Sequence, residues 1–315
     1  MNAANLSAWL GVEISAMSLM SGGAIQQNWR LDVIGQAWVL RTDAPATLTV
    51  SRGRAEEFAL LQAAFAAGVT VPEPLLLCTD LSVIGRPFFV MQRIEGVADR
   101  HRIVRSETLG DGREALVAAL GRELARIHEI RPGHPALAFL GPPALPAAAR
   151  FVGEMRAALD ARPPRPMLEW GLRHLERSAP AASETVLCHN DFRSGNFMVD
   201  EAGISGILDW EFAAWGDPHE DIGWLCAKCW RAGGPGEVGG IGSREAFYAA
   251  YETVSGRRID PAQVAWWELA ATIRWAVIAL AQADRHLSGA EPSLSLALTG
   301  HIVPELELDV MRATA

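Results

Sequence analysis

His189, Asp191, Asn196 and Asp209 are the residues of this chain whose types and spacing could do chemistry. Asp191 is a candidate general base, and Asn196 and Asp209 offer hard oxygen ligands of the kind that magnesium prefers. One base and two such ligands form the set that magnesium-assisted chemistry on a phosphate substrate requires. The alternative interpretation is that the two aspartates are unrelated turn residues and that Asn196 caps a nearby element.

Short apolar runs flank these polar residues and predict the strands that hold them, at 186–188, 197–199 and 207–208. The turn sequence Asp200-Glu-Ala-Gly203 lies between the last two runs and predicts that they pair as a hairpin. We therefore expect the polar side chains to converge at one end of a small buried sheet.

The order and spacing of these residues resemble the catalytic loop and metal-binding aspartate of kinases. Three segments carry the resemblance: HNDFRSGN, ILDWE and GDPHEDIGW. In this form they look like the aminoglycoside phosphotransferase and choline kinase-like family rather than the protein kinases. The resemblance implies that Asp191 is the catalytic base, that Asn196 and Asp209 hold magnesium, and that His189 has a structural role.

The same resemblance implies the fold class, an α+β, two-lobed protein-kinase-like fold. Residues 1–96 would form a small nucleotide-binding lobe around an antiparallel sheet. Residues 97–315 would form a larger, mostly helical lobe with the catalytic and substrate-binding residues. ATP, or GTP, and Mg²⁺ are the implied cofactors, and the implied partner is a small molecule with a hydroxyl group. We expect a monomer or a homodimer.

The Ser21-Gly22-Gly23 turn in the first lobe matches the family's nucleotide-binding loop. Glycines at such a turn let backbone N–H groups approach phosphate oxygens. The match is partial, because Ile25 and Gln26 stand where the family often has Ser and Asn. On its own, a Ser-Gly-Gly turn is most often a bend between two strands, here of a predicted three-stranded meander.

Lysine is almost absent from this chain, because all of its 28 basic residues except Lys228 are arginines. A Walker A loop, which needs Gly-Lys-Ser/Thr, is therefore excluded, and so is a phosphate-binding lysine in the first lobe. Arg41 closes a predicted strand about where that lysine would sit, and Glu57 on the following helix is its expected partner. The alternative is that Arg41 lies at the surface and pairs with Asp43.

Gln92 to Ile94 follow the last predicted strand of the first lobe and resemble the interlobe hinge, where backbone groups meet the adenine edge. The lobe boundary is expected near Gly96. Periodicity predicts helices at 52–68, 113–130, 147–160, 166–178, 219–231, 243–255 and 261–286. Asp217 and Asp221 are expected to cap a helix and to anchor the catalytic loop.

The net charge is −9 and no basic tract occurs, which argues against nucleic acid or an anionic membrane as a partner. The first residues lack a basic run followed by an apolar run, so we expect no signal peptide and a cytoplasmic location. The apolar segment 265–283 contains Glu268 and Arg274, which predicts a buried helix rather than a membrane span.

Cys226 and Cys229 are interpreted as packed cysteines rather than a zinc site, because no second pair exists.

These patterns lead to the hypothesis of an ATP- or GTP-dependent, magnesium-requiring phosphotransferase that acts on a hydroxyl group of a small molecule. An aminoglycoside-like compound, an amino alcohol, a sugar or a hydroxylated acyl compound all remain open. The second lobe carries more acidic than basic residues, which suits a cationic alcohol. The alternative from another class is a nucleotide-binding module with weak catalysis, which the missing lysine supports.

Two further features near the predicted site have two interpretations each. Arg193 either meets a phosphate or substrate oxygen or forms a salt bridge. Tryptophans crowd the region after the predicted metal site, at 210, 215, 224 and 230. Core packing explains most of them, and one or two could line an apolar or cation–π wall.

Overall fold

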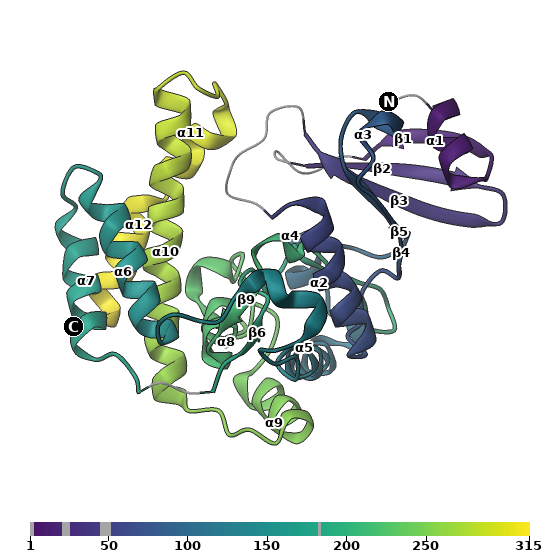
Figure 1. Ribbon diagram of the computed structural model, residues 1–315. Coiled ribbons are helices and arrows are strands. Elements are labelled where there is room, and N and C mark those ends of the chain that lie inside the picture. The colour runs from purple at the N-terminus through teal and green to yellow at the C-terminus, as the bar shows by residue number, and fades with distance from the viewer. Residues whose placement is uncertain (1–2, 21–25, 45–51, 182–183) are drawn as a thin grey trace.

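The computed structural model describes residues 3–20, 26–44, 52–181 and 184–315 and shows a sheet-rich lobe beside a helix-rich lobe (Figure 1). The first lobe contains a five-stranded antiparallel sheet in the order β1-β2-β3-β5-β4. Its strands are β1 (Ile14–Leu19), β2 (Gln26–Val33), β3 (Gln36–Asp43), β4 (Pro74–Cys78) and β5 (Phe88–Gln92). The helices of this lobe are α1 (Ala3–Leu10), α2 (Arg54–Ala66) and α3 (Leu81–Ile84). This architecture confirms the predicted meander and the small antiparallel-sheet lobe.

Alternation along the central strand β3 sends its side chains to opposite sides of the sheet. Trp38 and Leu40 pack with Leu6 of α1 in one hydrophobic cluster. Val39 and Arg41 instead line a cavity between the two lobes. Because side chains alternate along β3, the buried guanidinium of Arg41 points toward the candidate site. The sequence patterns did not predict α1, which covers part of the sheet (Figure 1).

Helix α2 carries Glu57 toward β3 and packs on the sheet through aromatic contact. The rings of Phe58 and Phe89 have centroids 5.7 Å apart. Gly68 follows the helix with φ +76°, a left-handed conformation that glycine adopts without steric cost. These bounds agree with the helix predicted at 52–68.

The second lobe is mostly helical, and the long helix α10 runs through its centre (Figure 1). Helices α6, α7, α8, α11 and α12 pack on α10, while α5 packs on α9. The helices are α4 (Arg100–Arg105), α5 (Arg113–Ile127), α6 (Ala147–Asp160), α7 (Pro166–Arg177), α8 (Pro218–Cys226), α9 (Arg244–Ser255), α10 (Pro261–Leu287), α11 (Leu294–Gly300) and α12 (Val303–Ala313). Most predicted helices are confirmed, but α4, α11 and α12 were not expected.

The helix predicted at 219–231 is wrong in its second half. α8 ends at Cys226, and Ala227 is extended at φ −56° and ψ 138°. Arg231 donates from Nη2 to the carbonyl oxygen of Cys226 at 3.0 Å, so a guanidinium takes the carbonyl that a continuing helix would use. A 3-10 turn then spans Lys228–Trp230.

Two small sheets hold the polar residues that the sequence singled out. β7 (Phe197–Val199) and β8 (Ile204–Ile207) pair antiparallel, which confirms the predicted hairpin. β6 (Val186–Cys188) pairs instead with β9 (Ala214–Gly216), a strand that was not expected. A bridge between Val97 and Val199 joins the end of the interlobe segment to the hairpin. The division of the chain at Gly96 stays a prediction.

Helix α10 is long and apolar enough, by length and composition, to cross a membrane. Its apolar residues are nevertheless packed inside the lobe, where Trp267, Ala270, Ile273 and Ala276 are buried. This burial agrees with the prediction of a core helix.

Candidate active site

A buried carboxylate in α8 holds the loop that runs from His189 to Asn196. Asp221 accepts hydrogen bonds from the backbone N–H groups of His189 and Asn190 at 2.6 and 2.7 Å. Burial opposes the charge of Asp221, but the hydrogen bond from His128 and the N–H donor of His189 keep its pKa below the ordinary value. Asn190 adopts a φ of 63°, which is uncommon outside glycine and which these bonds stabilise. The predicted anchoring of the loop by Asp221 is confirmed.

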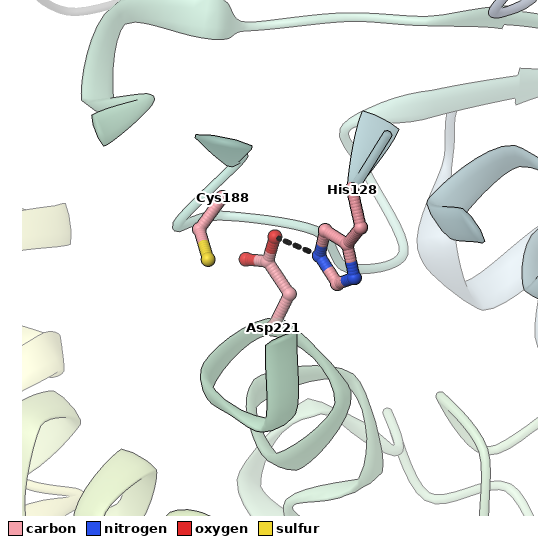
Figure 2. Close-up of side chains that lie close together, drawn as sticks. All are labelled: His128, Cys188 and Asp221. Carbon is pink, nitrogen blue, oxygen red and sulfur yellow. Dashed lines mark hydrogen bonds and ion pairs between the residues drawn. The ribbon is translucent and has the colours of Figure 1, made fainter. Parts of the chain in front are cut away.

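Figure 2 shows Asp221 beside His128 and Cys188, three groups that together could hold a metal ion. Each of them already has a protein partner. His128 Nε2 lies 3.3 Å from Asp221, and His128 Nδ1 lies 2.8 Å from the Tyr251 hydroxyl. Cys188 donates to the carbonyl of Asp217, and burial raises the pKa of this thiol well above its ordinary value. Because the contacts of these three groups are made within the protein and two of them hold the backbone of the loop, we interpret the cluster as the anchor of the loop.

His189 connects the loop to the end of strand β8. Its Nε2 lies 2.9 Å from the carbonyl oxygen of Leu208, and its Nδ1 lies 3.3 Å from the backbone nitrogen of Asp191. A neutral ring with the proton on Nε2 satisfies both contacts. The ring also packs on Trp210, with centroids 4.8 Å apart. These contacts confirm the predicted structural role of His189.

The Asp191 carboxylate is oriented by donors on both oxygens. Arg193 Nε and Trp224 Nε1 lie 2.9 and 3.0 Å from Oδ1, and the amide nitrogen of Asn196 donates to Oδ2. The side chain is 15% exposed, so it remains open to a substrate. Arg193 therefore forms a salt bridge here, which was one of its two predicted roles. Trp224 was not predicted to touch the candidate base.

Asn196 and Asp209, the predicted metal ligands, meet where the loop joins the hairpin. The Leu208 N–H donates to the carbonyl of Asn196 at 2.8 Å, which brings Asp209 beside the loop. Asn196 Nδ2 also donates to the Asp191 carbonyl at 2.9 Å, so its amide oxygen is the atom left for another ligand. Asp209 is 38% exposed on the cavity side. An amide oxygen and an open carboxylate fit a hard cation such as Mg²⁺.

Arg41 forms ion pairs with carboxylates from two elements. Its Nη2 lies 2.8 Å from Glu57 of α2, and its Nη1 lies 2.9 Å from Asp209. Burial works against the charge, but attraction to Glu57 and Asp209 outweighs it and raises the pKa of Arg41. The expected pairing with Glu57 is confirmed. The alternative pairing with Asp43 is wrong, because Asp43 pairs with Arg54 at 3.0 Å.

A cavity of about 430 Å³ between the lobes brings five predicted residues together: Arg41, Glu57, Gln92, Ile94 and Asp209. Its other walls are mainly apolar and include Val39, Leu61, Phe89, Met91 and Ile207. A mostly apolar pocket with a few converging polar groups is the usual form of a small-ligand site. Ser21, Gly22 and Gly23 lie outside the described residues.

Gln26 and Glu211 form a contact in this cavity that the sequence did not reveal. Gln26 Nε2 donates to Glu211 at 2.5 Å and so links β2 to the segment after Asp209. Burial raises the pKa of Glu211 to about 7, and the negative charges of Glu57 and Asp209 add to this effect against the attraction of Arg41. The only signal for Glu211 was its position two residues after Asp209.

Asp217, Cys226 and Cys229 have structural roles. Asp217 caps α8 by accepting from the backbone N–H of His219 at 2.8 Å, as predicted. Burial raises the pKa of both cysteine thiols to about 12. Within the described part of the chain, neither cysteine belongs to a group of three metal-ligating side chains. The structure agrees with the interpretation of packed cysteines.

Two curated relatives share sequence with the chain over about 200 residues. Acyl-CoA dehydrogenase family member 10 of Mus musculus is 32% identical over 200 residues, which cover 60% of this chain and 18% of that protein. Acyl-CoA dehydrogenase family member 11 of Gallus gallus is 32% identical over 222 residues, which cover 64% of this chain and 26% of that protein. The matched region is thus about a quarter or less of the length of these relatives.

Three solved structures are similar over nearly their whole length. A Ralstonia eutropha protein, provisionally assigned as an aminoglycoside phosphotransferase, has a TM-score of 0.77 at 21% identity and covers 99% of this chain and 98% of its own. Spectinomycin phosphotransferase, solved with ADP and spectinomycin, has a TM-score of 0.65 at 14% identity, with coverage of 100% and 98%. A choline/ethanolamine kinase family protein of Mesorhizobium loti has a TM-score of 0.64 at 17% identity, with coverage of 99% and 96%. At these identities the similarity shows the fold, which is the predicted two-lobed kinase-like fold.

The sequence profile of the phosphotransferase enzyme family matches residues 17–290. This span contains all of the residues that line the interlobe cavity, the loop at 189–196 and the whole of α10. It therefore covers both lobes and the residues that were brought together above. The chain belongs to the phosphotransferase enzyme family.

Proposed function

We propose that this chain transfers the γ-phosphoryl group of ATP, or of GTP, to a hydroxyl group of a small molecule. The single observation that carries the proposal is the meeting of two groups of residues: Arg41 and Asp209 line the interlobe cavity and pair with each other, and the adjoining loop holds Asn196 against Asp191. Charge neutralisation and positioning are what phosphoryl transfer requires of a protein.

Asp191 is the proposed base. The hydroxyl oxygen of the acceptor forms a bond to the γ-phosphorus while the bond to the β-phosphate oxygen breaks. The hydroxyl proton passes to the Asp191 carboxylate, whose orientation Trp224 and Arg193 maintain through Oδ1. The products are ADP and a phosphate ester, so atoms and charge balance.

Asn196 and Asp209 are the proposed ligands of Mg²⁺, which would neutralise charge on the nucleotide phosphates when bound. Arg41 takes the position of the kinase lysine. Its Nε is buried and has no hydrogen-bond partner among the described residues. A phosphate oxygen would supply that partner, and a guanidinium can bind phosphate while it also pairs with a carboxylate.

A hydroxylated acyl compound is our first candidate for the acceptor. The support is the name of the two relatives, both called acyl-CoA dehydrogenase family members. In those longer proteins, the segment that is similar to this chain is part of a polypeptide that is named for acyl-CoA chemistry. The spectinomycin and choline kinase-like neighbours keep aminoglycosides and amino alcohols on the panel of acceptors.

A nucleotide-consumption screen tests the function. Purified protein is supplied with ATP or GTP, Mg²⁺ and one alcohol at a time: an aminoglycoside, choline, a sugar and a hydroxyacyl thioester. We expect one class to release ADP or GDP together with a phosphorylated product. The Asp191→Asn variant is the negative control. Its turnover should be lower by a factor on the order of 10² to 10⁴, and it should still bind nucleotide. Nucleotide binding without any phosphorylated product would favour the alternative of a nucleotide-binding module.

A further inference from the structure

A second cavity of about 850 Å³ lies in the helical lobe, between the 228–234 segment, α10, α11 and α12. One wall is aromatic and consists of Trp230 and Trp275. Another part of the lining is aliphatic, and its residues recur at every fourth position: Leu294, Leu298, Ile302 and Leu306. Leu294 and Leu298 are 74% and 56% exposed, so this wall presents apolar surface without a covering element in the described part of the chain.

Direct contacts connect the aromatic wall to the proposed base. The guanidinium of Arg193 lies over the Trp230 ring, 4.6 Å from its centroid, and Arg193 Nε lies 2.9 Å from Asp191. Trp224, which also donates to Asp191, packs on Trp230 with centroids 4.9 Å apart, and Trp275 packs on Trp230 at 4.7 Å. The cavity wall therefore begins one side chain away from the Asp191 carboxylate.

The charges of the cavity have a positive excess. Arg100 and Arg231 line it, and within the described ranges neither forms a salt bridge with a carboxylate; Arg231 donates to the carbonyl oxygen of Cys226. Lys228 and Asp309 neutralise each other at 2.5 Å. Glu305 is the remaining carboxylate of the lining. The acidity of the whole lobe therefore does not extend to this cavity, and a polycationic acceptor would meet two guanidinium groups that no carboxylate of the described residues neutralises.

Trp230 adds a polar group to the cavity wall. The ring is 5% exposed, and its Nε1 has no hydrogen-bond acceptor among the described residues. Buried donors without a partner are rare in proteins. An oxygen atom of a bound molecule would be a suitable partner for this donor.

We infer that this cavity is the subsite for the acceptor alcohol, and that the acceptor is an anionic molecule with an aliphatic body, such as a hydroxylated carboxylic acid. The inference rests on the proposed function, because it takes Asp191 as the base. The aliphatic body would lie between the tryptophans and the leucine wall, and the anionic group would meet Arg100 and Arg231. Its hydroxyl group would then be directed past Arg193 toward Asp191.

Equilibrium binding of 3-hydroxydecanoate to the full chain tests the inference without nucleotide. We expect saturable binding by calorimetry, and at least tenfold weaker binding of the neutral analogue 1,3-decanediol. Leu298→Asp places a charge on the aliphatic wall, and Arg100→Gln removes one cation; each should weaken 3-hydroxydecanoate at least tenfold. Both side chains are exposed, so the fold should tolerate these changes.

Leu287→Asp and Arg105→Gln are the matched controls. Leu287 is an exposed leucine at the end of α10, and Arg105 is an exposed arginine of the same helix as Arg100; neither lines the cavity. Both control variants should bind like the wild type. Absence of saturable binding, or equal binding in the cavity variants and the controls, overturns the inference.

A separate phosphoryl-transfer assay with ATP distinguishes failure of this inference from failure of the proposed function. Phosphorylation of 3-hydroxydecanoate that falls in the two cavity variants, with unchanged ATP binding, supports the subsite. Phosphorylation of kanamycin or choline, with no effect of either cavity substitution, overturns the subsite and leaves the proposed function in place. If ATP binds but no alcohol is phosphorylated, the proposed function itself fails, and the acceptor role of the cavity fails with it.

Discussion

Arg41, the proposed substitute for the kinase lysine, differs from lysine in its chemistry. A lysine ammonium is a compact point charge, whereas the guanidinium of Arg41 has separate nitrogens for Glu57 and Asp209 and a third, Nε, that faces neither. An arginine at this position can therefore hold α2 and the Asp209 segment together and still bind a phosphate oxygen.

Loss of the Arg41 side chain should weaken nucleotide binding or turnover by at least roughly tenfold, about 1.4 kcal/mol. Arg41→Lys should recover part of the loss, because it restores the charge without the fork. Glu57→Ala should also be damaging, since Glu57 pairs with Arg41 at 2.8 Å. The measurements are ATP titrations and steady-state kinetics. Wild-type kinetics in Arg41→Ala would end the assignment.

The metal role of Asp209 has a test that does not depend on the acceptor. Asp209→Ala should remove the tightening of ATP binding that Mg²⁺ produces, because the open carboxylate of this residue is the proposed ligand. Glu201→Ala, in the exposed turn of the neighbouring hairpin, is the matched control and should keep the effect. Identical magnesium dependence in wild type and Asp209→Ala would rule the ligand role out.

At the scale of elements, the site depends on how α8 meets the end of β6. Asp221 supplies both oxygens to consecutive N–H groups of the loop, at 2.6 and 2.7 Å. The loop therefore takes its conformation from a helix rather than from its own sequence. Helix α8 therefore also determines, through this loop, where Asp191 lies.

Asp221→Ala should destabilise the protein by about 1–3 kcal/mol for each of the two buried N–H groups that it leaves unpaired. Asp260→Ala is the control, because Asp260 is an exposed cap of α10 that accepts from the Ala262 N–H at 2.9 Å and from the Gln263 side chain at 3.4 Å; its loss should cost only about 1 kcal/mol. Urea denaturation measures both. Equal losses in the two variants would contradict the anchoring role.

Sequence patterns identified the residues that share a local spacing, and they missed the contacts between residues that lie far apart in the chain. The residues Asp191, Asn196 and Asp209 were found because their function requires a fixed local spacing. The donor Trp224 lies 33 residues from Asp191, and Gln26 lies 185 residues from Glu211, so no local pattern links either pair. Helices α1, α11 and α12 were likewise missed. The periodicity that revealed the other helices did not identify these segments.

At the scale of the whole molecule, the polar contacts that join the lobes at the cavity include Gln26 with Glu211 and Arg41 with Asp209. Both bridge from the sheet to the segment that follows β8. Burial raises the pKa of Glu211 from 4.5 to about 7. The protonation of this carboxyl group therefore affects one of the contacts that join the lobes.

This shift predicts a pH dependence of stability. Between pH 4.5 and about 7 the folded protein keeps a proton on Glu211 that the unfolded chain has lost, so the contribution of this group to stability falls as pH rises through that window. Glu211→Gln should make the decline of the unfolding free energy with pH less steep. Glu237→Gln, an exposed glutamate, should leave it unchanged. Glu220, whose pKa burial also raises to about 7, should maintain part of the decline in every variant.

The presence of arginine rather than lysine in the proposed nucleotide cavity also determines how this protein responds to chemical labelling. Reagents that carry an acyl group on a nucleotide mark kinases by acylating a lysine amine beside the phosphates. Here the cation in that place is Arg41, whose raised pKa keeps it protonated and non-nucleophilic. The only side-chain amine, on Lys228, lies at the other cavity. An inventory of kinases made with such reagents would therefore pass over this chain even when its proposed nucleotide site is fully occupied.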